Sequence, residues 1–263
     1  MKSEPFISCD LQGRKVLITG GASGIGKAAA QLFIALGAEV VVADVQEEAV
    51  AHAADEVGAR GWVQVDVSDE QGVNYMISET AGILGGLNAV FHCAGVHNAG
   101  KSLEQPIDEW QRVMDVNVRG THLVCTRAAK HMADIEGGAI VVVSSIATFS
   151  GFPRRSAYGT SKAAVSYLTR CLACEWGELG IRVNCIAPGY TLTPMAQSIV
   201  AEGNTDAARI ENRTPLHRFA EPIEIARAAA FLLSNWASYI TGAELFVDGG
   251  WSAFGGSGEV QTF

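Results

Sequence analysis

The chain has 263 residues, of which 48% are hydrophobic, and it carries a net charge of −9 at pH 7. That length suits one α/β domain with a sizeable core, so we expect a single domain over residues 1–263. The acidic balance argues against a nucleic-acid or anionic-membrane surface, and no apolar run approaches the roughly 18 residues of a membrane helix.

Seven short apolar runs in chain order predict strands, with helical periodicity between them. The runs are Lys15–Thr19, Glu39–Ala43, Trp62–Val65, Ala89–Cys93, Ala139–Val143, Arg182–Ile186 and Glu244–Val247. Helical stretches include Ile25–Leu36, Pro106–Met132 and Ser161–Trp176. Continuous rather than alternating apolar runs suit a parallel sheet that is covered on both faces. The sequence therefore predicts a doubly wound Rossmann fold with a seven-stranded parallel sheet.

Polar residues and glycines gather directly after these strands. Open α/β sheets bind ligands outside the carboxyl ends of their strands. We therefore expect motif residues that are scattered in the sequence to meet along one edge of the sheet.

A glycine-rich turn follows the first predicted strand and precedes a helix, which is the context that a phosphate-binding turn needs. Its candidate residues are Gly20, Ser23, Gly24, Ile25 and Gly26. The helix N-terminus offers N–H groups and partial positive charge to a pyrophosphate. An ordinary glycine turn is the alternative, but the flanking elements and a downstream acidic residue favour a dinucleotide site.

The acidic residue is Asp44, at the end of the second predicted strand. A carboxylate there can hydrogen-bond the adenosine ribose hydroxyls, and it repels a 2′-phosphate. No Lys or Arg follows it closely, so we expect NAD rather than NADP as cofactor. A turn aspartate is the alternative interpretation.

Tyr158 and Lys162 stand four residues apart, so on a helix they share one face. A nearby ammonium group favours the phenolate, and we expect it to lower the tyrosine pKa. Such a tyrosine can exchange a proton with an alcohol or a carbonyl while a nicotinamide carries the hydride. Ser145 ends a strand upstream, where its hydroxyl can hold the substrate oxygen; Ser144 is the competing candidate.

From Gly13 to Gly250 the chain resembles the short-chain dehydrogenase/reductase superfamily, in its single-domain branch. The resemblance rests on the glycine turn, Asp66-Val67, Cys93-Ala94-Gly95, Asn117, Ser145, Tyr158 with Lys162, and Asn184 through Pro188-Gly189 to Thr193. The family usually has asparagine where this chain has Cys93. The spacing to the tyrosine in that family favours Ser145 over Ser144.

The resemblance also implies roles for individual residues. Asp66 and Val67 would flank the adenine, Ala94 and Gly95 would lie along the cofactor, and Lys162 would bind the nicotinamide ribose. Pro188 and Gly189 would close over the nicotinamide, with Thr191 and Thr193 at its carboxamide and the phosphates. Asn117 would hold a water that links Lys162 to solvent. For Val65 we expect core packing alone.

Substrate specificity should depend on residues that surround this site. The candidates are His97, Asn98, Ala147, Thr148, Phe152, Arg154, Arg155, Tyr190 and Met195, with the polar stretch 193–215 as a lid. Arg155 could bind an anionic substrate, although a solvated arginine is the commoner case. The expected substrate is a small secondary alcohol or ketone, such as a polyol or hydroxy acid.

Assembly and location are also predicted. Family members commonly form tetramers, and Trp251, Phe254 and Phe263 in the tail 251–263 would need a partner surface if they were exposed. A frayed terminus is the alternative. Met1–Pro5 lacks the features of a signal peptide, and six scattered cysteines suit reduced thiols, so we expect a cytoplasmic protein. No ligand spacing indicates a metal site, because Cys171 and Cys174 lack a second pair.

The leading hypothesis is thus an NAD-dependent dehydrogenase or ketone reductase with Tyr158 as general acid/base. A catalytically silent NAD(H)-binding redox sensor or scaffold is the alternative, although binding alone does not need the tyrosine. An epimerase or dehydratase on the same fold would need a larger substrate domain.

Overall fold

A computed structural model describes residues 10–135, 137–201, 206–256 and 258–260 of the chain. Seven strands form one parallel sheet in the order β3-β2-β1-β4-β5-β6-β7, which confirms the predicted doubly wound α/β fold. The strands are β1 (Lys15–Thr19), β2 (Glu39–Asp44), β3 (Gly61–Gln64), β4 (Ala89–His92), β5 (Gly138–Val143), β6 (Ile181–Pro188) and β7 (Glu244–Val247). Strand order reverses between β1 and β4, where such sheets bind their ligands.

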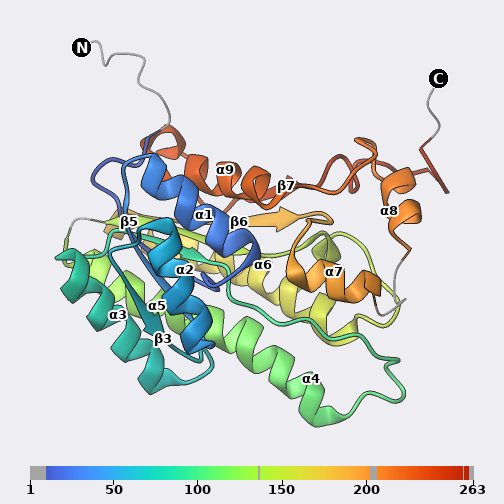
Figure 1. The fold of residues 1–263 in the computed structure, drawn as a ribbon, viewed down its shortest axis with the longest axis horizontal. Helices are drawn as coiled ribbons and strands as arrows, with labels where there is room; N and C mark the ends of the chain where they lie inside the picture. Colours follow the sequence, from blue (N-terminus) through green and yellow to red (C-terminus); the bar gives the residue numbers. More distant parts are fainter. Residues whose placement is uncertain (1–9, 136, 202–205, 257, 261–263) are drawn as a thin grey trace.

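Helices cover both faces of the sheet (Figure 1). One face packs against α1 (Gly24–Ala35), α2 (Glu47–Val57) and α9 (Pro222–Leu233), and its core includes the edge-to-face pair Phe33 and Phe91. The other face packs against α3 (Glu70–Leu84), α5 (Gly120–Ala133) and α6 (Ser156–Trp176), around Met76 and Met132. Both cores are built from buried Val, Ile, Leu and Ala, as the continuous apolar strands predict.

The predicted helix Pro106–Met132 is divided in the structure. It consists of α4 (Ile107–Met114), a π-helical segment Asp115–Arg119, and α5. At the junction, a Cβ on Gly120 would lie 2.9 Å from Val67 Cγ2, so only glycine allows this close approach to the loop after β3. The wider π turn contains Asn117, and such turns often occur at functional sites.

The polar stretch 193–215 contains two helices, α7 (Pro194–Ala201) and α8 (Ala207–Arg213), and residues 202–205 between them lie outside the described residues. Both helices project from one end of the molecule (Figure 1, right). The movement of this stretch as a lid stays a prediction.

Trp251 and Phe254 in the tail are half-buried against their own chain, so these two residues lack the exposure that would call for a partner surface; the tetramer itself stays a prediction. The Trp251 ring lies 4.4 Å from the Arg213 guanidinium carbon, and the Phe254 ring lies 5.2 Å from it. Arg213 also donates to the carbonyl oxygens of Trp251 and Phe254, at 3.2 Å each. The tail thus packs on α8 of its own chain, a contact between distant segments that the sequence pattern does not reveal. Phe263 lies outside the described residues.

Among the described helices, none is both long and apolar enough to cross a membrane. The five cysteines in the described part of the chain are unbridged.

Candidate active site

A cavity of about 860 Å³ is lined by residues that follow six of the seven strands. The polar residues that follow the strands therefore meet at the carboxyl edge of the sheet, as expected. From the predicted cofactor and catalytic residues, the lining contains Gly20, Ser23, Gly24, Ile25, Asp44, Asp66, Val67, Ala94, Gly95, Ser145, Tyr158, Lys162, Pro188, Gly189, Thr191 and Thr193. From the predicted substrate residues it contains His97, Ala147, Phe152, Arg155, Tyr190 and Met195.

Gly26 and Asn117 are absent from the lining and lie behind the cavity wall. Val65, for which only core packing was expected, is buried yet also contributes to the lining.

The glycine turn has no room for side chains. A Cβ on Gly26 would lie 2.0 Å from the Gly20 carbonyl oxygen, and a Cβ on Gly20 would lie 2.8 Å from the Ala94 backbone nitrogen. Gly24 has φ +53, a conformation that favours glycine. The Ser23 side chain does not cap α1, so it leaves the first-turn N–H groups to an anion. The turn therefore fits a dinucleotide pyrophosphate.

Asp44 lies at the end of β2 beside this turn. Its carboxylate accepts from the Ala22 backbone N–H at 3.2 Å and from the Gln46 N–H at 3.3 Å. These bonds fix the carboxylate at the cavity wall, where its remaining acceptor positions suit a pair of ribose hydroxyls.

Ser144 and Ser145 have different surroundings. The Ser144 hydroxyl is buried and lies 3.0 Å from both the Ile186 carbonyl oxygen and Glu244 Oε1. The Ser145 hydroxyl accepts from the Ala147 N–H at 3.1 Å and hydrogen-bonds the Tyr158 phenol inside the cavity. Of the two serines, Ser145 is thus the one placed beside the tyrosine.

The structure does not support the expected lowering of the Tyr158 pKa by Lys162. The Lys162 ammonium lies 5.8 Å from the centre of the Tyr158 ring and donates to the Val143 carbonyl oxygen at 2.8 Å. Burial lowers the pKa of Lys162 to about 8.

The Tyr158 pKa is raised above its ordinary value by burial of the phenol. The hydrogen bond from Ser145 and the charge of Arg155 pull it back only in part. A lowered pKa was therefore the wrong prediction for the protein without ligand, because spacing on a helix does not reveal how deeply a side chain is buried.

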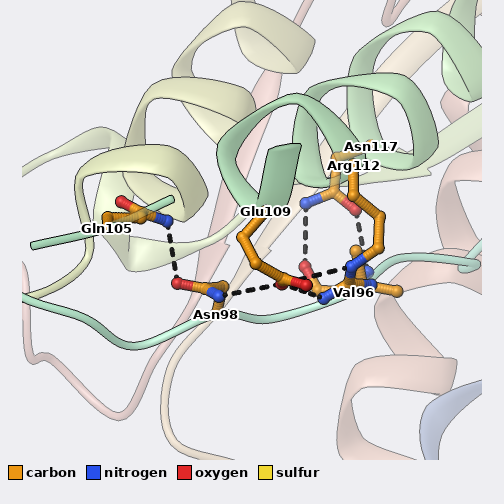
Figure 2. Close-up of polar contacts among 6 residues, drawn as sticks. All are labelled: Val96, Asn98, Gln105, Glu109, Arg112 and Asn117. Atoms are coloured by element: carbon orange, nitrogen blue, oxygen red, sulfur yellow. Dashed lines mark hydrogen bonds and ion pairs between the residues drawn. The ribbon is translucent and has the colours of Figure 1, made fainter. Parts of the chain in front are cut away.

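Asn117 holds the loop that follows β4 (Figure 2). Its amide exchanges two hydrogen bonds with the Val96 backbone, accepting from the N–H at 2.8 Å and donating to the carbonyl at 2.9 Å. It also donates to Ser161 Oγ at 2.9 Å. The side chain therefore has a positioning role, while the water-holding role that the resemblance implies stays a prediction.

Sequence reasoning missed the polar side of the cavity that α4 supplies. Asp108, Gln111, Arg112 and Asp115 line it, from α4 and the π-helical segment. The sequence of Pro106–Met132 predicts a helix, but it does not indicate which face of that helix lines the cavity.

Cys93, where the family usually has asparagine, also lines the cavity, and burial raises its thiol pKa to about 12. The thiol is therefore neutral and packs as a small apolar group. Within the described residues, no group of three or more His, Cys, Asp or Glu side chains is arranged to hold a metal ion.

Comparison with known proteins decides the family. The family model described as "Enoyl-(Acyl carrier protein) reductase" matches residues 20–252. The chain belongs to the short-chain dehydrogenase/reductase superfamily. It is 41% identical to cis-4-hydroxycyclohexanecarboxylate dehydrogenase of Sinomonas cyclohexanicum, over 91% of this chain and 97% of the relative.

Two further proteins of this superfamily extend the comparison. The chain is 39% identical to 2,5-dichloro-2,5-cyclohexadiene-1,4-diol dehydrogenase of Sphingobium indicum, over 93% of this chain and 99% of the relative. The crystal structure of a short-chain type dehydrogenase/reductase from Mycobacterium marinum superposes with a TM-score of 0.87 at 34% identity, covering 92% and 97% of the two chains. The chain spans about half (46%) of an uncharacterised relative from Sinorhizobium fredii, with 38% identity.

Proposed function

We propose that this protein is an NAD-dependent dehydrogenase of cyclic secondary alcohols, acting also as the reductase of the matching ketones. The observation that carries the proposal is that one cavity contains the glycine turn, Asp44 and the Ser145–Tyr158 pair. A dinucleotide bound along the turn would reach the tyrosine within the same cavity. Two relatives named for dehydrogenation of hydroxylated six-membered rings support the oxidation of CH–OH groups.

In the proposed reaction, the Ser145 hydroxyl holds the substrate oxygen beside the Tyr158 phenol. Tyr158 takes the alcohol proton in oxidation and returns it in reduction. Its raised pKa means that the free protein keeps the phenol protonated near neutral pH, the form that donates in ketone reduction. The bound nicotinamide supplies the hydride acceptor or donor.

Lys162 and Asn117 support the Ser145–Tyr158 pair. Lys162 keeps its proton near neutral pH, since its pKa is about 8, and its ammonium would bind the nicotinamide ribose. Asn117 ties the loop after β4 to the π-helical segment and to Ser161, one residue before Lys162. Its amide thereby fixes the loop after β4, which forms part of the cavity wall, relative to α6.

NAD is the proposed cofactor because of the charge at the ribose end. Asp44 and Asp66 both line the cavity there, and a 2′-phosphate would meet their negative charge. Among the residues that line the cavity, the nearest in sequence to Asp44 are Ala43, Val45 and Gln46, which supply no positive charge.

The substrate end has an aromatic wall. Phe152 and Tyr190 line the cavity, and Trp251, which does not line it, packs behind them with ring centroids 6.4 Å from Phe152 and 5.0 Å from Tyr190. Flat apolar surfaces of this kind suit the body of an alicyclic ring.

We also propose a homotetramer in the cytoplasm. Family members commonly form tetramers, and Phe149 and Tyr167 are 58% and 66% exposed, which suits a contact with another subunit. Free thiols suit a reducing compartment.

The decisive experiment is a panel of cyclic secondary alcohols with NAD or NADP, followed by the absorbance of the reduced nicotinamide. We expect turnover of at least one ring alcohol with NAD and much slower turnover with NADP. Binding of NADH without turnover of any alcohol or ketone would instead favour the catalytically silent sensor or scaffold.

A further inference from the structure

Tyr190 brings a second phenol group to the cavity. It lies shortly after the end of β6, lines the cavity and is half-buried. Within the part of the chain that the structure describes, no residue is hydrogen-bonded to its hydroxyl, and that oxygen is not among the fully buried polar atoms. A tyrosine that is buried to this degree usually has a partner for its hydroxyl. Because Tyr190 lines the cavity, a ligand bound there can be that partner.

The ring of Tyr190 is held by aromatic neighbours. It meets the Phe219 ring edge to face, with centroids 5.9 Å apart, and the Trp251 ring at 5.0 Å. Phe219 is buried, and the Arg213 guanidinium carbon lies 4.4 Å from the centre of the Trp251 ring. Edge-to-face pairs stabilise more than their buried area alone would. These contacts limit the directions in which the Tyr190 hydroxyl can point.

The backbone of Tyr190 is fixed as well. The Ala220 N–H donates to the Tyr190 carbonyl oxygen at 2.9 Å, and the Leu192 N–H donates to the Ala220 carbonyl oxygen at 2.8 Å. Directly before Tyr190, the Gly189 N–H donates to the Val247 carbonyl oxygen at 3.0 Å, which ties the segment to β7. The hydroxyl is therefore positioned before any substrate binds, which lowers the entropy cost of recognition.

The Tyr190 phenol is uncharged near neutral pH. Burial raises its pKa above the ordinary value, and the charges of Arg155 and Arg213 pull it back only in part. A neutral phenol both donates and accepts hydrogen bonds, so it suits the oxygen of a hydroxyl or a carbonyl group. The charge of Arg155 acts on Tyr158 too, which indicates that the two phenol groups lie at the same end of the cavity.

We propose that the Tyr190 hydroxyl binds a second, uncharged oxygen on the ring of the substrate, which would make the substrate a ring diol or a ring hydroxyketone. This rests on the proposed function, in which Ser145 and Tyr158 hold the oxygen of the reacting carbon. The ring that joins the two oxygens would pack on the aromatic wall of Phe152 and Tyr190. A substrate without the second oxygen leaves the Tyr190 hydroxyl unpaired, and this difference selects against it.

The first test measures binding without turnover. The full-length protein is saturated with NADH, so that the bound cofactor cannot accept a hydride from an alcohol. The positional isomers of cyclohexanediol, and the methylcyclohexanols of the same ring position and stereochemistry, are then titrated by calorimetry. For at least one ring position we expect the diol to bind more tightly than its methyl counterpart. Tyr190→Phe should lower the ratio of these two affinities about threefold to tenfold, the effect of one hydrogen bond between uncharged groups.

Tyr75→Phe is the matched control. It makes the same change at an exposed tyrosine on α3 that does not line the cavity, so it should leave the ratio intact. Equal thermal unfolding midpoints would show that both variants are folded. Affinity ratios that stay the same in Tyr190→Phe at every ring position would overturn the proposal. A lower NADH affinity with unchanged ratios would mean that the hydroxyl contacts the cofactor instead, and would also overturn it.

The second test separates recognition of the second oxygen from a general effect on the shape of the cavity. It compares turnover of the preferred diol with that of the matching methylcyclohexanol, both with NAD. We expect Tyr190→Phe to raise KM for the diol several-fold and to leave the methylcyclohexanol nearly unchanged. Equal loss for both substrates would mean that Tyr190 only shapes the aromatic wall, and would refute the contact. Absence of turnover with every alcohol would refute the proposed function, while the calorimetric ratios would still decide the contact.

Discussion

Glu244 and Ser144 are a hundred residues apart in the chain, yet Ser144 Oγ lies 3.0 Å from Glu244 Oε1. The same oxygen accepts from Thr148 Oγ1 at 2.9 Å, and Thr148 also hydrogen-bonds the Ser145 carbonyl. Glu244 Oε2 accepts from Ser166 on α6 at 2.7 Å. One carboxylate thus binds Ser144 and Thr148, on either side of Ser145 in the chain. The same carboxylate also binds the helix that carries Tyr158.

Glu244→Ala should therefore reduce both stability and rate. Ser166 loses its acceptor, and Ser144 and Thr148 each keep only a backbone carbonyl, which should cost about 1–3 kcal/mol of unfolding free energy. The Ser145 segment should shift, and kcat should fall on the order of tenfold while NADH affinity changes little. Glu244→Gln keeps one acceptor oxygen and should recover much of the rate. Denaturant titration measures the stability of both variants, and steady-state kinetics measure their kcat. An unchanged kcat in Glu244→Ala would exclude a role of Glu244 in positioning Ser145.

Asp44→Ala should weaken NAD and improve the relative use of NADP. The variant would lack the carboxylate that is proposed to accept from the ribose hydroxyls, which should cost about tenfold in NAD affinity, and it would no longer repel a 2′-phosphate. The ratio of kcat/KM for the two cofactors measures the change. Comparable efficiency with NAD and NADP in the unmutated protein would contradict this role of Asp44.

His92 should make the protein less stable in acid. Burial, reinforced by the charge of Lys162, lowers its pKa from 6.5 to about 3, so the folded protein keeps this ring neutral. In the unfolded chain the ring binds a proton below its ordinary pKa, so between these two pH values the unfolded state holds the extra proton. Stability therefore falls as pH falls through this window, by up to about 1.4 kcal/mol per pH unit from this residue.

His92→Asn removes that titration, and the unfolding free energy of the variant should depend less on pH. Urea titrations from pH 7 to about 5 measure the slope. His122→Asn, at an exposed position on α5, is the control and should keep the wild-type slope. The same slope in His92→Asn as in the unmutated protein would mean that other groups cause the acid loss.

Deletion of Gly255–Phe263 should loosen α8 without unfolding the sheet. The deletion removes the bond from the Val260 N–H to the Asn212 carbonyl at 2.9 Å, and the bond from Asn212 to Glu259 at 3.1 Å. Trp251 and Phe254 remain on Arg213. We expect KM for the alcohol to rise several-fold and the proposed tetramer to weaken. Light scattering and kinetics on one sample test this, and no change in either would leave the tail without a role.

Local signals were enough to predict the sheet. Each strand is an apolar run that ends in a polar residue or is followed by glycine or a polar residue, and β1 and β7 have the predicted bounds. The cavity lining followed from the same logic, because carboxyl ends of parallel strands meet at one edge. What the sequence could not predict depends on contacts between distant segments. These are the Glu244 network, the packing of the tail on Arg213, and the burial that raises the pKa of Tyr158.

The most direct test of the central claim is Tyr158→Phe, because it removes only the hydroxyl that is assigned to proton transfer. With a ring alcohol and NAD, we expect kcat to fall by about 10²–10⁴-fold. NADH affinity, measured by fluorescence titration, should stay within a few-fold of that of the unmutated protein, since the glycine turn and Asp44 are untouched. Turnover close to the unmutated rate in this variant would contradict the assignment of Tyr158 as the general acid/base.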